Sequence, residues 1–113
     1  MAKFAPVTVT ESQLAALDEE HDGVLHFEGD KDMAPFCYVI RRPTAGELTS
    51  YQGALKPKGI LASNRLFLKA LCVYPTGADF DRQIERWPSS AGACLTSDRF
   101  TAFSGGIVSE HQK

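Results

Sequence analysis

Histidine and cysteine have the widest chemical scope in this chain, because both can ligate metals and both take part in nucleophilic catalysis. The chain has three of each. They are His21, His26, His111, Cys37, Cys72 and Cys94. No two histidines have the four-residue spacing that places a metal-binding pair on one helix face, and no two cysteines form a CxxC motif. The spacing therefore predicts no metal site of these kinds.

Two aspartates, Asp30 and Asp32, are spaced like the first ligands of a calcium loop. The position that requires a bidentate glutamate holds Arg41, so this segment is interpreted as a turn. The glycines are too scattered to form a dinucleotide fingerprint or a phosphate loop. Serines such as Ser63 and Ser90 are possible nucleophiles, but no base or orienting group can be assigned to them. The sequence predicts no cofactor and no enzymatic activity.

The composition predicts one soluble globular domain. Hydrophobic residues make up 43% of the 113 residues and charged residues 23%, which is ordinary globular usage. A net charge of −2 gives no general attraction to nucleic acid, and no apolar run is long enough to cross a membrane. The N-terminal residues lack the apolar segment of a signal peptide, so we expect a cytoplasmic location with reduced, buried cysteines.

Four residues are candidates for binding a protein partner. Arg41 and Arg42 end a predicted strand, where two guanidinium groups can form a fork that binds a carboxylate. The alternative is that Arg41 lies on the solvent side of the strand and Arg42 pairs within the chain, for example with Glu47. Tyr51 and Tyr74 combine a large apolar ring with a polar hydroxyl, a combination that suits an interface anchor if the side chain is exposed.

The first half of the chain predicts an arm, a helix and a β-hairpin. Residues 1–9 have no regular period and are interpreted as an arm. Thr10 and Gln13 form a capping-box pattern that starts a helix, which ends near Gly23. Two runs rich in strand-forming residues follow, at 24–28 and 36–41, with a turn between them. Pro43 closes the second strand.

The second half of the chain predicts four helices. A capping box at Thr44 starts one helix, which is expected to end in an exposed basic loop at 56–59. The segment 60–73 is apolar around most of its circumference and is expected to be a central, buried helix. Its most buried positions are predicted to be Leu66, Phe67, Leu68, Leu71 and Val73. A helix opened by Asp79 follows, and a last helix is expected from Ser90 to Phe103, capped by Ser89.

These elements together predict an α+β fold, with an N-terminal helix, a β-hairpin and a mostly helical C-terminal part. We expect residues 10–106 to form a single domain and residues 107–113 to be a flexible tail.

The run Tyr38–Leu48 (YVIRRPTAGEL) resembles a segment of the small tail assembly chaperones of long-tailed bacteriophages, in which a strand is followed by a basic residue, Pro, Thr, Glu and a helix. Cys72–Pro75 (CVYP) resembles a Val-Tyr-Pro corner of that family. Phe80–Pro88 is similar to the helix that follows this corner. The order of these segments agrees with the family over residues 10–106.

The resemblance implies a protein without catalytic residues that binds the helical tape measure protein in the cytoplasm of the infected bacterium. It also implies contact with tail tube subunits, which assemble around the tape measure protein, and a homo-oligomer is possible. The basic loop at 56–59 departs from a typical member. The alternatives are a structural protein of the virion tail or neck, and a small inhibitor that binds a host protein.

Overall fold

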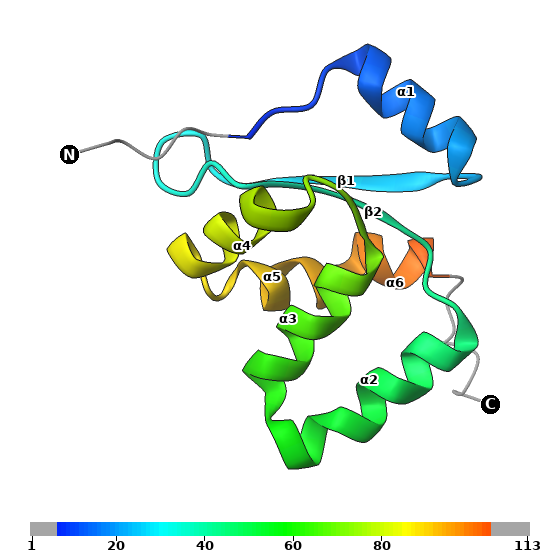
Figure 1. Ribbon diagram of the computed structural model, residues 1–113, viewed down its shortest axis with the longest axis vertical. Helices are drawn as coiled ribbons and strands as arrows, with labels where there is room; N and C mark the ends of the chain where they lie inside the picture. Colours follow the sequence, from blue (N-terminus) through cyan, green and yellow to red (C-terminus); the bar gives the residue numbers. More distant parts are fainter. Residues whose placement is uncertain (1–6, 105–113) are drawn as a thin grey trace.

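The computed structural model describes residues 7–104, and their fold is α+β, as the sequence predicted (Figure 1). The predicted tail at 107–113, which includes His111, lies outside the described residues, as do the last two residues of the predicted domain, 105–106, and most of the predicted arm at 1–9. The elements in chain order are α1 (Glu11–Glu20), β1 (Val24–Glu28), β2 (Cys37–Arg41), α2 (Ala45–Lys58), α3 (Ile60–Leu71), β3 (Cys72–Tyr74), α4 (Gly77–Arg86), α5 (Ser90–Leu95) and α6 (Asp98–Phe103).

Two capping boxes start α1 and α2, and both predictions are confirmed. The Thr10 hydroxyl accepts from the amide of Gln13 at 3.1 Å, and the Gln13 side chain accepts from the amide of Thr10 at 2.9 Å. Thr44 and Glu47 make the same reciprocal pair at the start of α2. Each box satisfies backbone amides that the first turn of a helix leaves unpaired.

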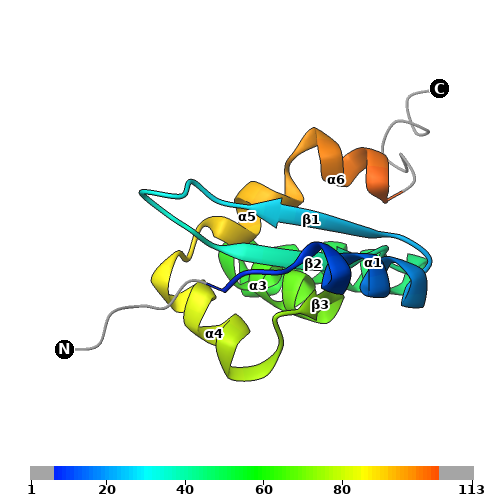
Figure 2. The same cartoon turned by 90° about the horizontal axis from the view of Figure 1, so that it is seen from above.

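The sheet has three antiparallel strands in the order β1-β2-β3 (Figure 2). The predicted hairpin is confirmed, with Val24 opposite Arg41 and Glu28 opposite Cys37. Figure 1 shows α1 on one face of the sheet and the helices α3 to α6 on the other. Because both faces are covered, the central strand β2 has four consecutive buried residues, from Cys37 to Ile40.

The third strand corrects the prediction of one helix over 60–73. Helix α3 ends at Leu71, and Cys72–Tyr74 leaves it to pair with β2, with Val39 opposite Tyr74. The cause is the open edge of β2, whose buried backbone groups need hydrogen-bond partners. Val73 and Tyr74 are of types that suit a strand. Val73 is therefore half-buried in the sheet and not among the most buried residues of a helix.

Two further helix predictions are wrong in their boundaries. Helix α2 runs through Pro57 to Lys58: the proline removes one hydrogen bond near the end of the helix, but the amide of Gly59 still bonds to Leu55 at 3.0 Å and continues the helix past it. The predicted last helix is split into α5 and α6, so five helices follow the hairpin within residues 7–104, where four were predicted. Ser97, and not Ser89, provides a cap there, by accepting from the first turn of α6.

The core lies between the sheet and α3 to α6. Of the five residues of the 60–73 segment that were predicted to be buried, Phe67, Leu68 and Leu71 are in this core. Leu66 is 53% exposed, so its prediction is wrong, because it lies on a side of α3 that does not pack into the core. Within residues 7–104, no helix combines the length and the apolarity that crossing a membrane requires.

We predict that Leu71→Ala lowers the free energy of unfolding by about 2–5 kcal/mol, because it leaves a cavity at a fully buried site. Leu66→Ala is the matched control on the same helix and should change it by less than about 0.5 kcal/mol. Urea denaturation measures both values. Equal losses for the two variants would contradict the placement of α3.

Candidate functional site

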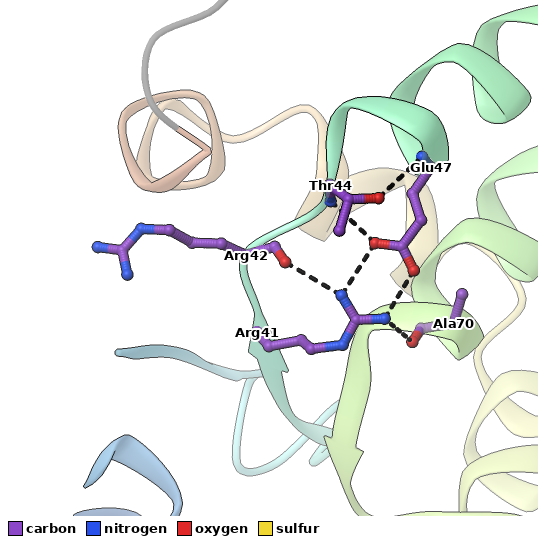
Figure 3. Close-up of polar contacts among 5 residues, drawn as sticks. All are labelled: Arg41, Arg42, Thr44, Glu47 and Ala70. Carbon is purple, nitrogen blue, oxygen red and sulfur yellow. Dashed lines mark hydrogen bonds and ion pairs between the residues drawn. The ribbon is translucent and has the colours of Figure 1, made fainter. Parts of the chain in front are cut away.

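The end of β2 is joined to α2 and α3 by one arginine (Figure 3). The Arg41 guanidinium donates from Nη1 to Glu47 Oε1 at 2.9 Å and from Nη2 to Glu47 Oε2 at 2.6 Å. It also donates to the carbonyl oxygens of Arg42 and Ala70, each at 3.1 Å. Ala70 lies in the last turn of α3. The partner of Glu47 is therefore Arg41, whereas the sequence-based alternative gave that place to Arg42.

Glu47 belongs to this junction and to the capping box at the same time. Its Oε1 accepts from the amide of Thr44 at 2.9 Å as well as from Arg41. The hydrogen bonds from Arg41, together with that amide, lower the pKa of Glu47 from its ordinary value of 4.5 to about 2. The fork of Arg41 is occupied by this carboxylate. Arg41 therefore stabilises the fold, and its guanidinium is not free to bind a partner's carboxylate.

Arg42 points away from Arg41 and holds a different part of the chain (Figure 3). Its Nη1 donates to the carbonyl oxygen of Asp22 at 2.7 Å, and its Nε donates to that of Phe103 at 3.1 Å. The guanidinium carbon lies 4.7 Å from the centre of the Phe103 ring. Glycine suits position 23 beside it, because its φ of 109° is one that other residues rarely adopt, and a Cβ there would also displace the end of the Arg42 side chain. Arg42 thus ties the end of α1 to the end of α6.

Tyr51 lies where α2 meets α3. Its ring stacks on Phe67 with 4.5 Å between the ring centres, and its hydroxyl donates to Asn64 Oδ1. The ring and hydroxyl are both engaged within the chain, and the side chain is half-buried. Tyr51 therefore anchors α2 to α3, which differs from a free interface anchor.

A groove of about 560 Å³ runs between α2 and α3 beside this pair. Its α2 wall includes Ser50, Tyr51, Ala54 and Lys58, and its α3 wall includes Ser63, Leu66, Phe67 and Ala70. Glu47 closes the end next to the sheet. Most of the wall surface is apolar, small side chains alternate with the rings of Tyr51 and Phe67, and the exposed Leu66 forms part of the rim. Such a surface suits an apolar partner better than a polar one.

A second hollow, of about 360 Å³, lies on the other side of the Tyr51 and Phe67 pair, against α5 and α6. It includes Leu48, Leu95 and Phe100. Because there is open space on both sides of the stacked rings, the contact between α2 and the rest of the protein is narrow. None of the residues of α2 is buried, although the helix is 14 residues long.

Ser63 on the α3 wall is an unexpected feature of the groove. It is 1% exposed, and its hydroxyl has no hydrogen-bond partner among the described residues. Its neighbour Asn64 is also buried but accepts from Tyr51. Ser63 and Asn64, two of the four polar residues of α3, were a signal in the sequence that this side of the helix differs from its core side. The sequence did not show which partner either residue would have.

Tyr74, the fourth candidate, lies apart from this groove. Its hydroxyl donates to the carbonyl oxygen of Thr8 at 2.7 Å, and it lines neither of the two hollows beside α2. It ties β3 to the segment that precedes α1. Of the four candidates, Tyr51 lines the groove and Arg41 borders it through its pair with Glu47. Arg42 and Tyr74 do not line the groove.

The side chains of His26, Glu28 and Cys37 lie close together on the hairpin, although nothing in their spacing along the sequence predicted it. The Sγ of Cys37 lies 3.5 Å from Nε2 of His26, and Oε2 of Glu28 lies 3.8 Å from the same nitrogen. A catalytic arrangement needs the thiol and the carboxylate on opposite ring nitrogens. Burial, with the nearby charge of Glu28, raises the pKa of Cys37 to about 11. The thiol is therefore protonated and is not an activated nucleophile.

Among residues 7–104, no three side chains of the metal-ligating types are grouped closely enough to hold an ion. No family model matches the chain, and no curated protein or solved structure matches it. The resemblance to tail assembly chaperones therefore rests on the sequence segments described above, and the groove is the main structural feature from which a function can be argued.

The junction predicts a specific acid sensitivity. The pKa of Glu47 is lowered in the folded state, so its stabilising effect is complete above about pH 4.5 and is lost as the pH falls towards about 2. Glu47→Gln should cost about 1 kcal/mol at neutral pH, a value reduced for the partial exposure of the pair, and the difference from wild type should vanish near pH 2–3. Thermal unfolding from pH 7 to pH 2.5 measures this.

Glu85→Gln is the control for this experiment, because Glu85 is exposed on α4 and forms no ion pair with the described residues. Its melting temperature should follow the wild-type pH profile. A constant difference between Glu47→Gln and wild type at every pH would show that the charge of Glu47 contributes nothing.

The thiols of the native protein should react slowly with Ellman's reagent at pH 8. All three are buried and unpaired, and burial raises the pKa of Cys37 to about 11 and of Cys72 and Cys94 to about 12. Unfolding in guanidinium should release three reactive thiols. Melting temperatures with and without reductant should also coincide. Rapid reaction of one thiol in the native protein would identify an accessible cysteine and contradict this.

Proposed function

We propose that the protein is a non-enzymatic tail assembly chaperone of a long-tailed bacteriophage, which binds the tape measure protein while the tail is assembled. The observation that carries the proposal is the open, mostly apolar groove between α2 and α3. It is accompanied by exposed leucine and isoleucine side chains on α3, namely Ile60, Leu61 and Leu66. The sequence resemblance over residues 10–106 supports the same role.

The physical argument concerns what such a client requires. A long apolar helical chain needs a surface that covers part of its apolar side until its final partners arrive. Helix α2, with open space on both sides, offers such a surface without requiring the core to open. In this proposal the partners are the tape measure protein and, through it, the tail tube subunits. The location is the cytoplasm of the infected bacterium.

Co-expression with the tape measure protein of the same phage tests the proposal. The tape measure protein should be insoluble when expressed alone, and it should become soluble and co-purify when this protein is present, because its apolar surface is then covered. A small α+β protein of similar size, expressed to the same level, is the control. Mass spectrometry of purified virions should not detect the chaperone.

Two results would contradict this role. Recovery of the protein in mature virions in stoichiometric amounts, without any complex with the tape measure protein, indicates a structural protein of tail or neck. Co-purification with a bacterial protein in its place indicates an inhibitor of the host.

A further inference from the structure

Helix α2 is less well covered than a helix of its length usually is. A helix of 14 residues is only marginally stable in water by itself, so it normally depends on burying one face. Here Leu48 and Tyr51 are only partly buried, and no residue of α2 is fully buried. Figure 1 shows α2 leading away from the sheet, to a corner from which α3 returns. The packing around α2 therefore has space for one more element.

The shape of the groove selects a helix as the missing element. On α3 the wall residues Ser63, Leu66 and Ala70 recur at helical spacing, and on α2 Ser50 and Ala54 do the same. Four of these five side chains are small, which lets another backbone come close, while Leu66 provides an apolar ridge. Two helices with a groove between them can hold a third helix by its apolar stripe.

The charges along the groove differ between its two ends. At the end next to the sheet, Glu47 is paired with Arg41. At the other end Lys58 lines the groove, Lys56 precedes it by two residues, and neither forms an ion pair with the described residues. The dipole of α3 has its positive end at this corner and that of α2 has its negative end there, so the two largely cancel and the charge of the corner comes from the two lysines. The corner therefore favours a negative group.

From these observations we propose that the groove between α2 and α3 binds an amphipathic helix of the partner, whose apolar stripe ends in an acidic residue at the α2–α3 corner. The inference rests on the proposed function and adds to it the chemistry of the client segment. The exposed Ile60 adds an apolar side chain at the corner, whereas Leu61 lines a separate hollow with Ile84 of α4. A second copy of the chain is disfavoured, because symmetric pairing of two corners would bring their lysines together.

Two designed helical peptides provide the probe. Both carry the same leucine stripe, and one has glutamates at one end where the other has lysines. In an NMR titration of the full chain, the glutamate peptide should shift the amides of Ala54, Lys58 and Leu66. It should bind about three- to tenfold more tightly than the lysine peptide at low ionic strength, and salt should reduce the difference.

Matched variants test whether the peptides bind in the groove. Lys58→Glu should reverse the preference between the two peptides, whereas Lys31→Glu makes the same charge change in the exposed turn between β1 and β2 and should not. Leu66→Ser should weaken both peptides about fivefold or more, whereas Met33→Ser, at an 81% exposed apolar residue, should not. Circular dichroism checks that each variant is folded. Tyr51 is left intact because it anchors α2.

Equal affinity for the two peptides, or shifts confined to another surface, would overturn the proposal. Self-association of the free chain that Leu66→Ser abolishes would overturn it as well, because the groove would then belong to a second copy. The chaperone role is tested separately. If the tape measure protein co-purifies with Lys58→Glu and Leu66→Ser as well as with wild type, the groove proposal fails and the role stands. If the peptide binds as expected but the tape measure protein does not, the role fails and the groove proposal stands.

Discussion

The bidentate pair between Arg41 and Glu47 is the interaction on which the shape of this molecule depends. It lies where the chain leaves the sheet, and it also reaches the last turn of α3 through the carbonyl oxygen of Ala70. Three elements therefore meet at one guanidinium group. Because α2 has no buried residue, its direction is set largely by this pair at its first turn and by the stacking of Tyr51 on Phe67 one turn later. The open groove follows from that arrangement, since beyond these contacts α2 reaches the core mainly through the partly buried Leu48.

A second constraint is the buried edge of β2. Strand β3 is only three residues long and cannot satisfy the whole edge. The side chain of Gln83, which is fully buried, continues the pairing by accepting from the amide of Cys37 at 2.9 Å and donating to its carbonyl oxygen at 2.8 Å. A glutamine amide thus takes the place of a peptide group of a longer strand. This bond fixes α4 against the sheet, while the bond between Tyr38 and Ser90, at 2.8 Å, does the same for α5.

The sequence was informative where short-range physics decides the structure. The capping boxes at Thr10 and Thr44 and the hairpin at 24–28 and 36–41 depend on residues close in the chain, and each was predicted correctly. Strand β3 was missed because its formation depends on the unpaired edge of β2, more than thirty residues away. The alternative that paired Arg42 with Glu47 and left Arg41 on the solvent side was wrong for the same reason. Adjacent arginines point to different parts of the chain, and only the packed fold decides which one reaches Glu47.

The candidate site shows the same division between local and long-range information. The arginines were predicted as binding residues because guanidinium groups bind carboxylates. A guanidinium group that lies where several elements meet, however, also binds carbonyl and carboxylate groups of its own chain. Leu66 drew attention only as a core residue, because an apolar side chain in an apolar helix gives no sign of which side is covered. Its neighbours Phe67 and Leu68 are buried, and it differs from them only in direction. An exposed apolar surface is thus hidden in the sequence by the same residue types that build the core, and it becomes visible only when the fold shows where the core ends.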